Sequence, residues 1–130
     1  IYDDYGHHPT EMEATINAIK AITKGKLYVI FQPHRYTRTK LLFDRFINPL
    51  SQADESYILD IYSAGEPAIP GISTKILLER GSPKNVHYAD STSSVINIVS
   101  VKAQTGDTVL TLGAGDITLV GPKIMETIND

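Results

Sequence analysis

Short runs rich in β-branched and aromatic residues alternate with segments of helical period along the 130 residues of the chain. The runs predict strands at 26–32, 55–62, 85–89 and 107–113, and a further short strand opens the chain. Parallel strands need crossover connections, which the intervening helices provide. We therefore expect an α/β fold, a Rossmann-like open and mostly parallel sheet of about five to six strands with helices on both faces.

The helices are marked by residues at their ends as well as by apolar spacing. Pro9 suits the first turn of one helix, and Pro122 suits that of the last. Gly81 ends a short helix, and Asp90 can cap another that runs to Val101. The β-branched residues before Val101 leave a strand as the alternative for that segment.

Composition limits the partners. A formal net charge of -3 provides no general polyanion-binding surface, so neither nucleic acid nor a membrane is an expected partner. The lack of cysteine excludes a disulfide framework and fits a cytoplasmic location. No apolar run approaches the roughly 18 residues of a membrane span. We expect one cytoplasmic domain over residues 1–130, cut from a longer protein, because the chain starts at Ile1 directly before a dense polar motif.

Polar clusters follow the predicted strands at one edge of the sheet. The stretch DDYGHHP follows the first strand, QPHRYTRT the second, YSAGEPAIPG the third and GAGD the last. Ligands of open α/β sheets bind just beyond the carboxyl ends of the strands. The clusters therefore predict a binding site at this edge.

The first cluster combines carboxylates with a phenol and two imidazoles. Asp3 and Asp4 can end a strand and cap a helix, or a carboxylate there can accept both hydrogen bonds of a ribose diol. Tyr5 can pack internally or stack on a base or sugar. For His7 and His8 we favour hydrogen bonds to a phosphate or carboxylate over metal binding, because no third ligand has a recognisable spacing. We expect no metal site in this chain.

The second cluster places His34, Arg35, Arg38 and Lys40 directly after a strand. Cations at a helix N-terminus oppose the helix dipole, so an anion should compensate them. Arg38 could clamp a carboxylate or phosphate with both guanidinium nitrogens. The alternative is a basic surface loop.

The remaining clusters are less specific. Gly113 and Gly115 let a backbone pass close to a ligand, although a tight turn needs the same residues. Glu66 is either a contact between domains or a solvated charge. No phosphate-binding motif of the form G-x-x-x-x-G-K-[ST] occurs, so a triphosphate would not be cradled by this domain alone. The edge therefore resembles half of an active site.

Taken together, DDYGHHPTE, FQPHRYTRT, YSAGE and GAGDI resemble the C-terminal domain of the Mur ligases, in the order of that family. Within the family, the pattern is most similar to ligases that add L-alanine to UDP-N-acetylmuramate. Ligases that reattach a recycled L-Ala-D-Glu-diaminopimelate tripeptide tend to carry Phe-Ala in place of Tyr5-Gly6. Two other classes stay open, a stand-alone nucleotide-binding regulatory module and a metal-dependent hydrolase that uses the carboxylates and imidazoles of the first cluster.

The resemblance implies a three-domain enzyme in peptidoglycan precursor synthesis. The N-terminal domain would bind the UDP-sugar, and the central domain would supply the phosphate-binding loop and most magnesium ligands. Neither domain is in this sequence, and the chain alone is expected to be inactive. ATP and Mg²⁺ are the implied cofactors, and ATP, L-alanine and UDP-N-acetylmuramate are the implied partners.

The resemblance also implies roles for single residues. Asp4 would hold the ATP ribose and Tyr5 would lie against the nucleotide. His7, His34 and Arg35 would act at the reaction centre, and His34 with Arg38 would receive the carboxylate of L-alanine. The loop near that centre would be shaped by Gly113 and Gly115.

Overall fold

The computed structural model describes residues 2–4, 8–81, 83–113, 117 and 119–129. Strands and helices alternate along the whole chain. The strands are β1 (Tyr2–Asp4), β2 (Leu27–Phe31), β3 (Glu55–Ile58), β4 (Val86–Tyr88) and β5 (Thr108–Leu112). The helices are α1 (Pro9–Ile22), α2 (Tyr36–Ser51), α3 (Thr74–Leu78), α4 (Thr92–Lys102) and α5 (Val120–Asn129).

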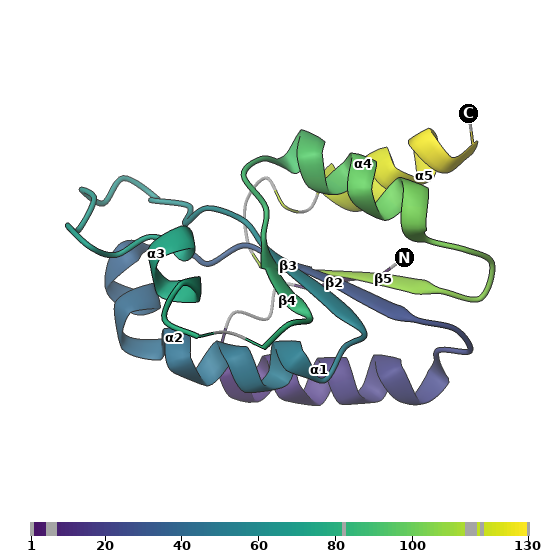
Figure 1. The fold of residues 1–130 in the computed structure, drawn as a ribbon, viewed down its shortest axis with the longest axis horizontal. Coiled ribbons are helices and arrows are strands. Elements are labelled where there is room, and N and C mark those ends of the chain that lie inside the picture. The colour runs from purple at the N-terminus through teal and green to yellow at the C-terminus, as the bar shows by residue number, and fades with distance from the viewer. Residues whose placement is uncertain (1, 5–7, 82, 114–116, 118, 130) are drawn as a thin grey trace.

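The five strands form one sheet in the order β1-β5-β2-β3-β4, and every neighbouring pair is parallel. Helices α1 and α2 cover one face of the sheet, and α4 and α5 cover the other (Figure 1). The prediction of a Rossmann-like α/β sheet with helices on both faces is confirmed. None of the helices in the described part of the chain is both long enough and apolar enough to cross a membrane.

Each face of the sheet has its own apolar core. Side chains of β2 alternate between the faces, so that Val29 packs toward α1 and α2 while Ile30 packs toward α4 and α5. The first core also contains the tilted pair Phe31 and Phe46, whose ring centroids are 4.9 Å apart. Because both faces are covered, β2 is buried along its whole length.

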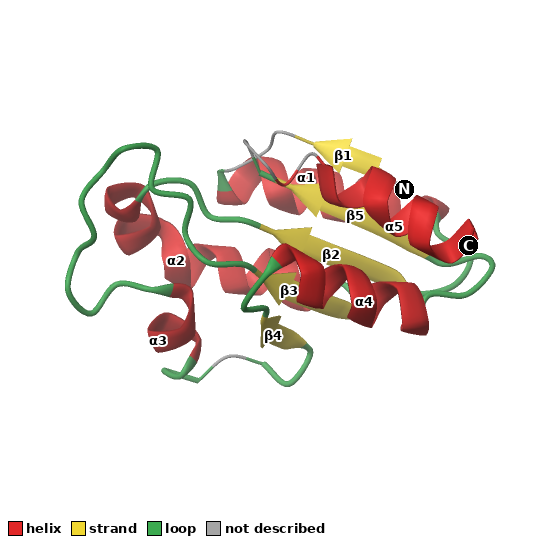
Figure 2. Ribbon diagram, turned by 90° about the horizontal axis from the view of Figure 1, so that it is seen from above, coloured by secondary structure: helices red, strands yellow, loops and turns green. Residues whose placement is uncertain are grey.

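Three local predictions need correction. Asp3 and Asp4 end β1, which was one of the alternatives for them, and both pair in register with β5, so the first polar cluster begins within the strand and not after it. The strand predicted at 55–62 ends at Ile58, and the chain beyond it enters a long loop that extends past the sheet beside α2 (Figure 2). The hydroxyl that caps α4 is that of Ser91, which accepts from the Ser94 N–H at 3.0 Å, so Asp90 is not the cap.

Two predictions about helices are confirmed. The segment that ends near Val101 forms helix α4, so the strand alternative was wrong there. Its apolar side chains Val95, Ile96 and Val99 recur at helical spacing and are buried against the sheet, which outweighs their β-branched preference. Pro9 and Pro122 both lie in first turns, of α1 and α5.

Candidate functional site

The strand order brings three of the predicted polar clusters to one place. Asp4 and Phe31 both pair in register with Leu112, the last residue of β5, so the carboxyl ends of β1, β5 and β2 lie side by side. From there α1 and α2 cover one face of the sheet while α5 covers the other (Figure 1). Such a divergence of connections opens a crevice at the strand ends, which is where ligands of open α/β sheets bind.

Gly113 is required by the close approach of two backbones. A Cβ atom at this position would lie 2.8 Å from the carbonyl oxygen of Gln32, and Gly113 has a φ of +133°. The Gln32 N–H donates to the Leu112 carbonyl at 3.1 Å, so the strand ends stay paired up to this point. The absence of a side chain at Gly113 therefore lets the chain ends after β2 and β5 approach each other closely.

The first polar cluster, which was expected to contact a nucleotide, is described only in part. Asp4 is the last residue of β1. Tyr5, His7 and Gly115 lie outside the described residues. His8 is the N-cap of α1, where its Nδ1 accepts a hydrogen bond from the Thr10 N–H at 3.2 Å. This contact gives His8 a structural role at the start of the helix.

The segments after β2 and β3 run side by side beyond the sheet. The ring of His34 stacks on that of Tyr62, with centroids 5.5 Å apart and planes 8° from parallel. The Arg35 N–H donates to the Tyr62 carbonyl at 2.7 Å, and the Tyr62 N–H donates to the Pro33 carbonyl at 2.9 Å. The QPHRYTRT and YSAGE clusters are therefore one structural unit. Tyr62 was assigned no role of its own from the sequence, where it ended the predicted strand at 55–62 and began the YSAGE cluster.

The two arginines of this unit lie at the start of α2. Arg35 is exposed and has a φ of +71°, in the left-handed region that residues with a side chain seldom adopt. Its carbonyl accepts from the N–H and the hydroxyl of Thr39, at 3.1 and 2.7 Å. Arg38 is partly buried, and its Nε has no hydrogen-bond partner within the described residues. A buried guanidinium N–H without an acceptor is available to an anionic ligand.

An anion at the start of α2 was predicted, and the chain supplies one itself. The Glu66 carboxylate accepts from the Thr37 hydroxyl at 2.8 Å and from the Thr37 N–H at 3.2 Å. These bonds, led by the hydroxyl and followed by the Thr37 amide, lower the pKa of Glu66, with smaller contributions from the Tyr36 amide and the Arg35 charge. Glu66 is therefore a helix cap and not only a solvated charge.

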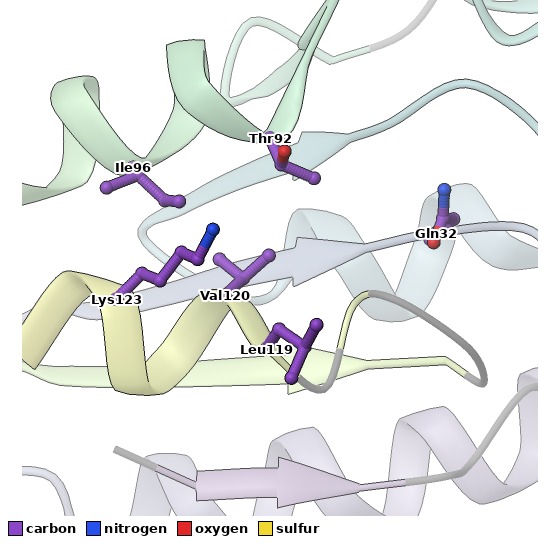
Figure 3. Close-up of a pocket in the computed structure, with 6 residues that line it drawn as sticks. All are labelled: Gln32, Thr92, Ile96, Leu119, Val120 and Lys123. Carbon is purple, nitrogen blue, oxygen red and sulfur yellow. The ribbon is translucent and has the colours of Figure 1, made fainter.

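A hollow of about 330 Å³ lies on the α4 and α5 side of the same edge. Lys123 reaches from α5 toward α4, and Gln32 lies at the strand end beyond it (Figure 3). The side-chain oxygen of Gln32 is buried without a hydrogen-bond partner in the described residues, whereas its amide nitrogen donates to the Asp60 carbonyl at 3.3 Å. The sequence did not predict this hollow, because its walls come from three separate elements.

A metal site in a protein needs several ligand side chains close together. Among the residues that the structure describes there is no group of three or more His, Cys, Asp or Glu side chains that could hold a metal ion. The first cluster is only partly covered by this statement, because His7 lies outside the described residues.

The sequence of the chain matches a known protein family. The family described as "Mur ligase, glutamate ligase domain" matches residues 1–115. The chain belongs to the Mur ligase family. Members of this family are ATP-dependent ligases that generally use Mg²⁺. The resemblance of the four polar clusters to Mur ligases is therefore confirmed.

Curated Mur ligases give the most detailed likeness. The chain is 43% identical over 132 residues to the UDP-N-acetylmuramate–L-alanine ligase of Koribacter versatilis, and 42% identical over 132 residues to that of Mycobacterium ulcerans. The matches cover 99% and 98% of this chain, but only 28% and 27% of the relatives. The chain thus spans less than a third of the length of the ligases that it resembles.

Solved Mur ligase structures share the fold. The UDP-N-acetylmuramate-alanine ligase of Thermotoga maritima superposes with a TM-score of 0.68 at 22% identity, over 96% of this chain and 25% of that one. A murein peptide ligase from Psychrobacter arcticus gives a TM-score of 0.73 at 16% identity, over 97% of this chain and 26% of that one. At these identities the structures show the fold of a Mur ligase domain.

Proposed function

We propose that this chain is the C-terminal domain of a UDP-N-acetylmuramate–L-alanine ligase. The observation that carries the proposal is the 43% identity, over 99% of the chain, to a relative of that name. In the proposed reaction the muramoyl carboxylate attacks the γ-phosphate of ATP, which yields an acyl phosphate and ADP. The amine of L-alanine then attacks the acyl carbon, so that an amide bond forms, phosphate leaves and the amine releases a proton.

The proposed nucleotide side of the domain is the crevice between β1 and β5. Asp4 would accept hydrogen bonds from the ATP ribose, and Tyr5 would lie against the nucleotide. The supporting observation is the position of Asp4 at the end of an edge strand, in register with Leu112 and next to Gly113. His7 and the loop of Gly113 and Gly115 would lie close to the transferred phosphate.

The proposed amino-acid side is the start of α2. His34 and Arg38 would bind the carboxylate of L-alanine, and His34 and Arg35 would steady the phosphate charge. Arg38 supports this role through its unpartnered Nε, and Arg35 through its exposure. Because Glu66 already occupies the Thr37 N–H, the substrate carboxylate would be bound by side chains and not by that amide.

The cations act mainly by placement. A neutral amine attacks an acyl phosphate readily when the two groups are close and water is excluded. Binding the carboxylate of L-alanine fixes the direction of its amine, while a second cation faces the phosphate. The domain therefore contributes orientation and charge, and no residue in it has to act as a strong base.

Magnesium would be held mainly by ligands of the central domain, as in the family that the chain resembles. The described residues contain no carboxylate or imidazole cluster that could hold a cation, and the sequence contains no phosphate-binding loop. Mg²⁺ bound with ATP would neutralise the phosphate charge during transfer. We further infer that the protein acts in the cytoplasm, without nucleic acid or a membrane as a partner.

The test is a ligation assay on the full-length protein. We expect phosphate release that requires ATP, Mg²⁺, UDP-N-acetylmuramate and L-alanine together, with a product whose mass is increased by one alanyl residue. The recycled tripeptide in place of L-alanine should give no product, and product with the tripeptide alone would identify the recycling ligase instead. The isolated 130-residue chain should give no turnover. Absence of ATP-dependent ligation with both L-alanine and the tripeptide would overturn the proposal.

A further inference from the structure

The segments that follow β2 and β3 are tied together beyond the end of their strands. The Leu59 N–H donates to the Phe31 carbonyl at 2.9 Å, and the Arg35 N–H donates to the Tyr62 carbonyl at 2.7 Å. Farther out, the link is made by the side chain of Glu66, which accepts both hydrogen bonds from Thr37. The loop after β3 therefore reaches the first turn of α2 through a carboxylate.

Helix α2 has no cap of its own, so it depends on the contact with Glu66 in a way that the other capped helices do not. The helices α1, α3 and α4 are each capped by the side chain that directly precedes them, namely His8, Ser73 and Ser91. The corresponding residue of α2 is Arg35, which makes no side-chain cap, and the first turn of α2 contains no acidic residue. Glu66 supplies from another loop both the missing acceptor and the negative charge that favours a helix N-terminus.

We infer that Glu66 is a positioning residue for the amino-acid carboxylate site, and this inference rests on the proposed function. Thr37 lies between Arg35 and Arg38 on the first turn of α2, so fixing Thr37 fixes the backbone from which both guanidinium groups extend. The Glu66 carboxylate also occupies the N–H and hydroxyl donors of Thr37 at the N-terminus of α2. The substrate is then left to the arginines, whose planar groups recognise a carboxylate with two parallel hydrogen bonds.

The contact also couples binding to the loop. Glu66 is in the same loop as Tyr62, on whose ring His34 stacks. Loss of the Glu66 contact should therefore loosen His34, Arg35 and Arg38 together, while the crevice between β1 and β5 keeps its own register. The expected signature is a weaker affinity for the amino acid with an unchanged affinity for the nucleotide.

The experiment compares variants of the full-length enzyme. Glu66→Ala should raise the KM for L-alanine about tenfold, as expected for loss of a strong cap, with the KM for ATP unchanged. Glu66→Gln keeps an oxygen that can accept from the Thr37 N–H, so its KM for L-alanine should rise by only about threefold. Glu79→Gln removes an equivalent exposed charge at the C-terminal end of α3 and should leave both constants unchanged.

The outcomes separate this inference from the proposed function. An active wild-type enzyme whose Glu66 variants bind L-alanine normally would overturn the inference alone. Equal changes in both KM values would also overturn it, because a general loss of structure affects both substrates. A wild-type enzyme that makes no product from L-alanine would overturn both. Thermal denaturation identifies a misfolded Glu66→Ala, and in that case Glu66→Gln decides between the outcomes.

Discussion

The carbonyl oxygen of Gln32 lies 2.8 Å from the place that a Cβ atom on residue 113 would occupy. No side chain fits there unless the ends of β2 and β5 move apart, because the obstructing atom is backbone. The relationship between Gln32 and Gly113 therefore fixes the spacing between the amino-acid side and the nucleotide side of the proposed site.

Replacement of Gly113 by alanine should destabilise the fold. The φ of +133° is strained for any residue with a side chain, which costs about 1–3 kcal/mol, and the contact with Gln32 adds to this cost. Gly71→Ala is the matched control, because Gly71 has a φ of +80° with no atom within 4 Å of its would-be Cβ. Urea denaturation should show the larger loss for Gly113→Ala, and equal losses would contradict the role of the Gln32 contact.

Arg38→Ala should weaken the binding of L-alanine. Loss of hydrogen bonds to a charged group costs about 1.5–3 kcal/mol, so the KM for L-alanine should rise between roughly tenfold and a hundredfold. ATP binding should remain nearly intact. Arg45→Ala removes an exposed arginine farther along the same helix, and it serves as the control in steady-state kinetics of the full-length enzyme. Unchanged alanine kinetics for Arg38→Ala would refute the assigned role.

Asp4→Asn should weaken the binding of ATP and leave that of L-alanine unchanged. An amide offers one uncharged acceptor oxygen where a carboxylate offers two charged ones to a ribose diol, so the KM for ATP should rise about tenfold while that for L-alanine stays constant. Calorimetry of the full-length protein with ATP measures the same loss directly. Asp44→Asn, an exposed position on α2, controls for the change in net charge. A normal ATP affinity of Asp4→Asn would show that Asp4 does not bind the ribose.

The stability contributed by Glu66 should depend on pH in one direction. Its pKa is lowered in the folded chain, chiefly by the Thr37 hydroxyl, so the ionised form stabilises the fold. This contribution is fully present above the unfolded value of about 4.3 and is lost as pH falls through the lowered folded value. The stability difference between wild type and Glu66→Gln should therefore be constant near neutrality and shrink in acid. A difference that grows on acidification would show that the sign is wrong.

The order of the elements could be read from the sequence because periodicity is a local property. Burial of β2 on both faces produces an unbroken apolar run, and the stripe of α2 recurs at helical spacing. Exact ends were harder to predict. Leu59 and Ile61 are apolar and buried, yet they lie past the end of β3, so composition alone extended that strand too far.

The contacts that organise the site could not be read in the same way. Glu66 and Thr37 are separated by most of α2 and all of β3, and no local pattern signals that their side chains meet. The positive charge of 34–40 predicted an anionic ligand, which stays a prediction, and gave no sign that the Glu66 carboxylate of the chain itself contacts Thr37. The stacking of His34 on Tyr62 likewise depends on how β2 and β3 are paired.

The position of β5 between β1 and β2 has a consequence for how the domain is made. The sheet neighbour of β1 is β5, which comes after β2, β3 and β4 in the chain, since Tyr2 pairs with Leu110 and Asp4 with Leu112. Contacts between such distant positions are slow to form, because the intervening chain must be closed into a loop first. During synthesis, β2, β3 and β4 are therefore made before Asp4 can pair with β5. Because β5 lies between β1 and β2, the two sides of the proposed site reach their final spacing only once β5 has joined the sheet.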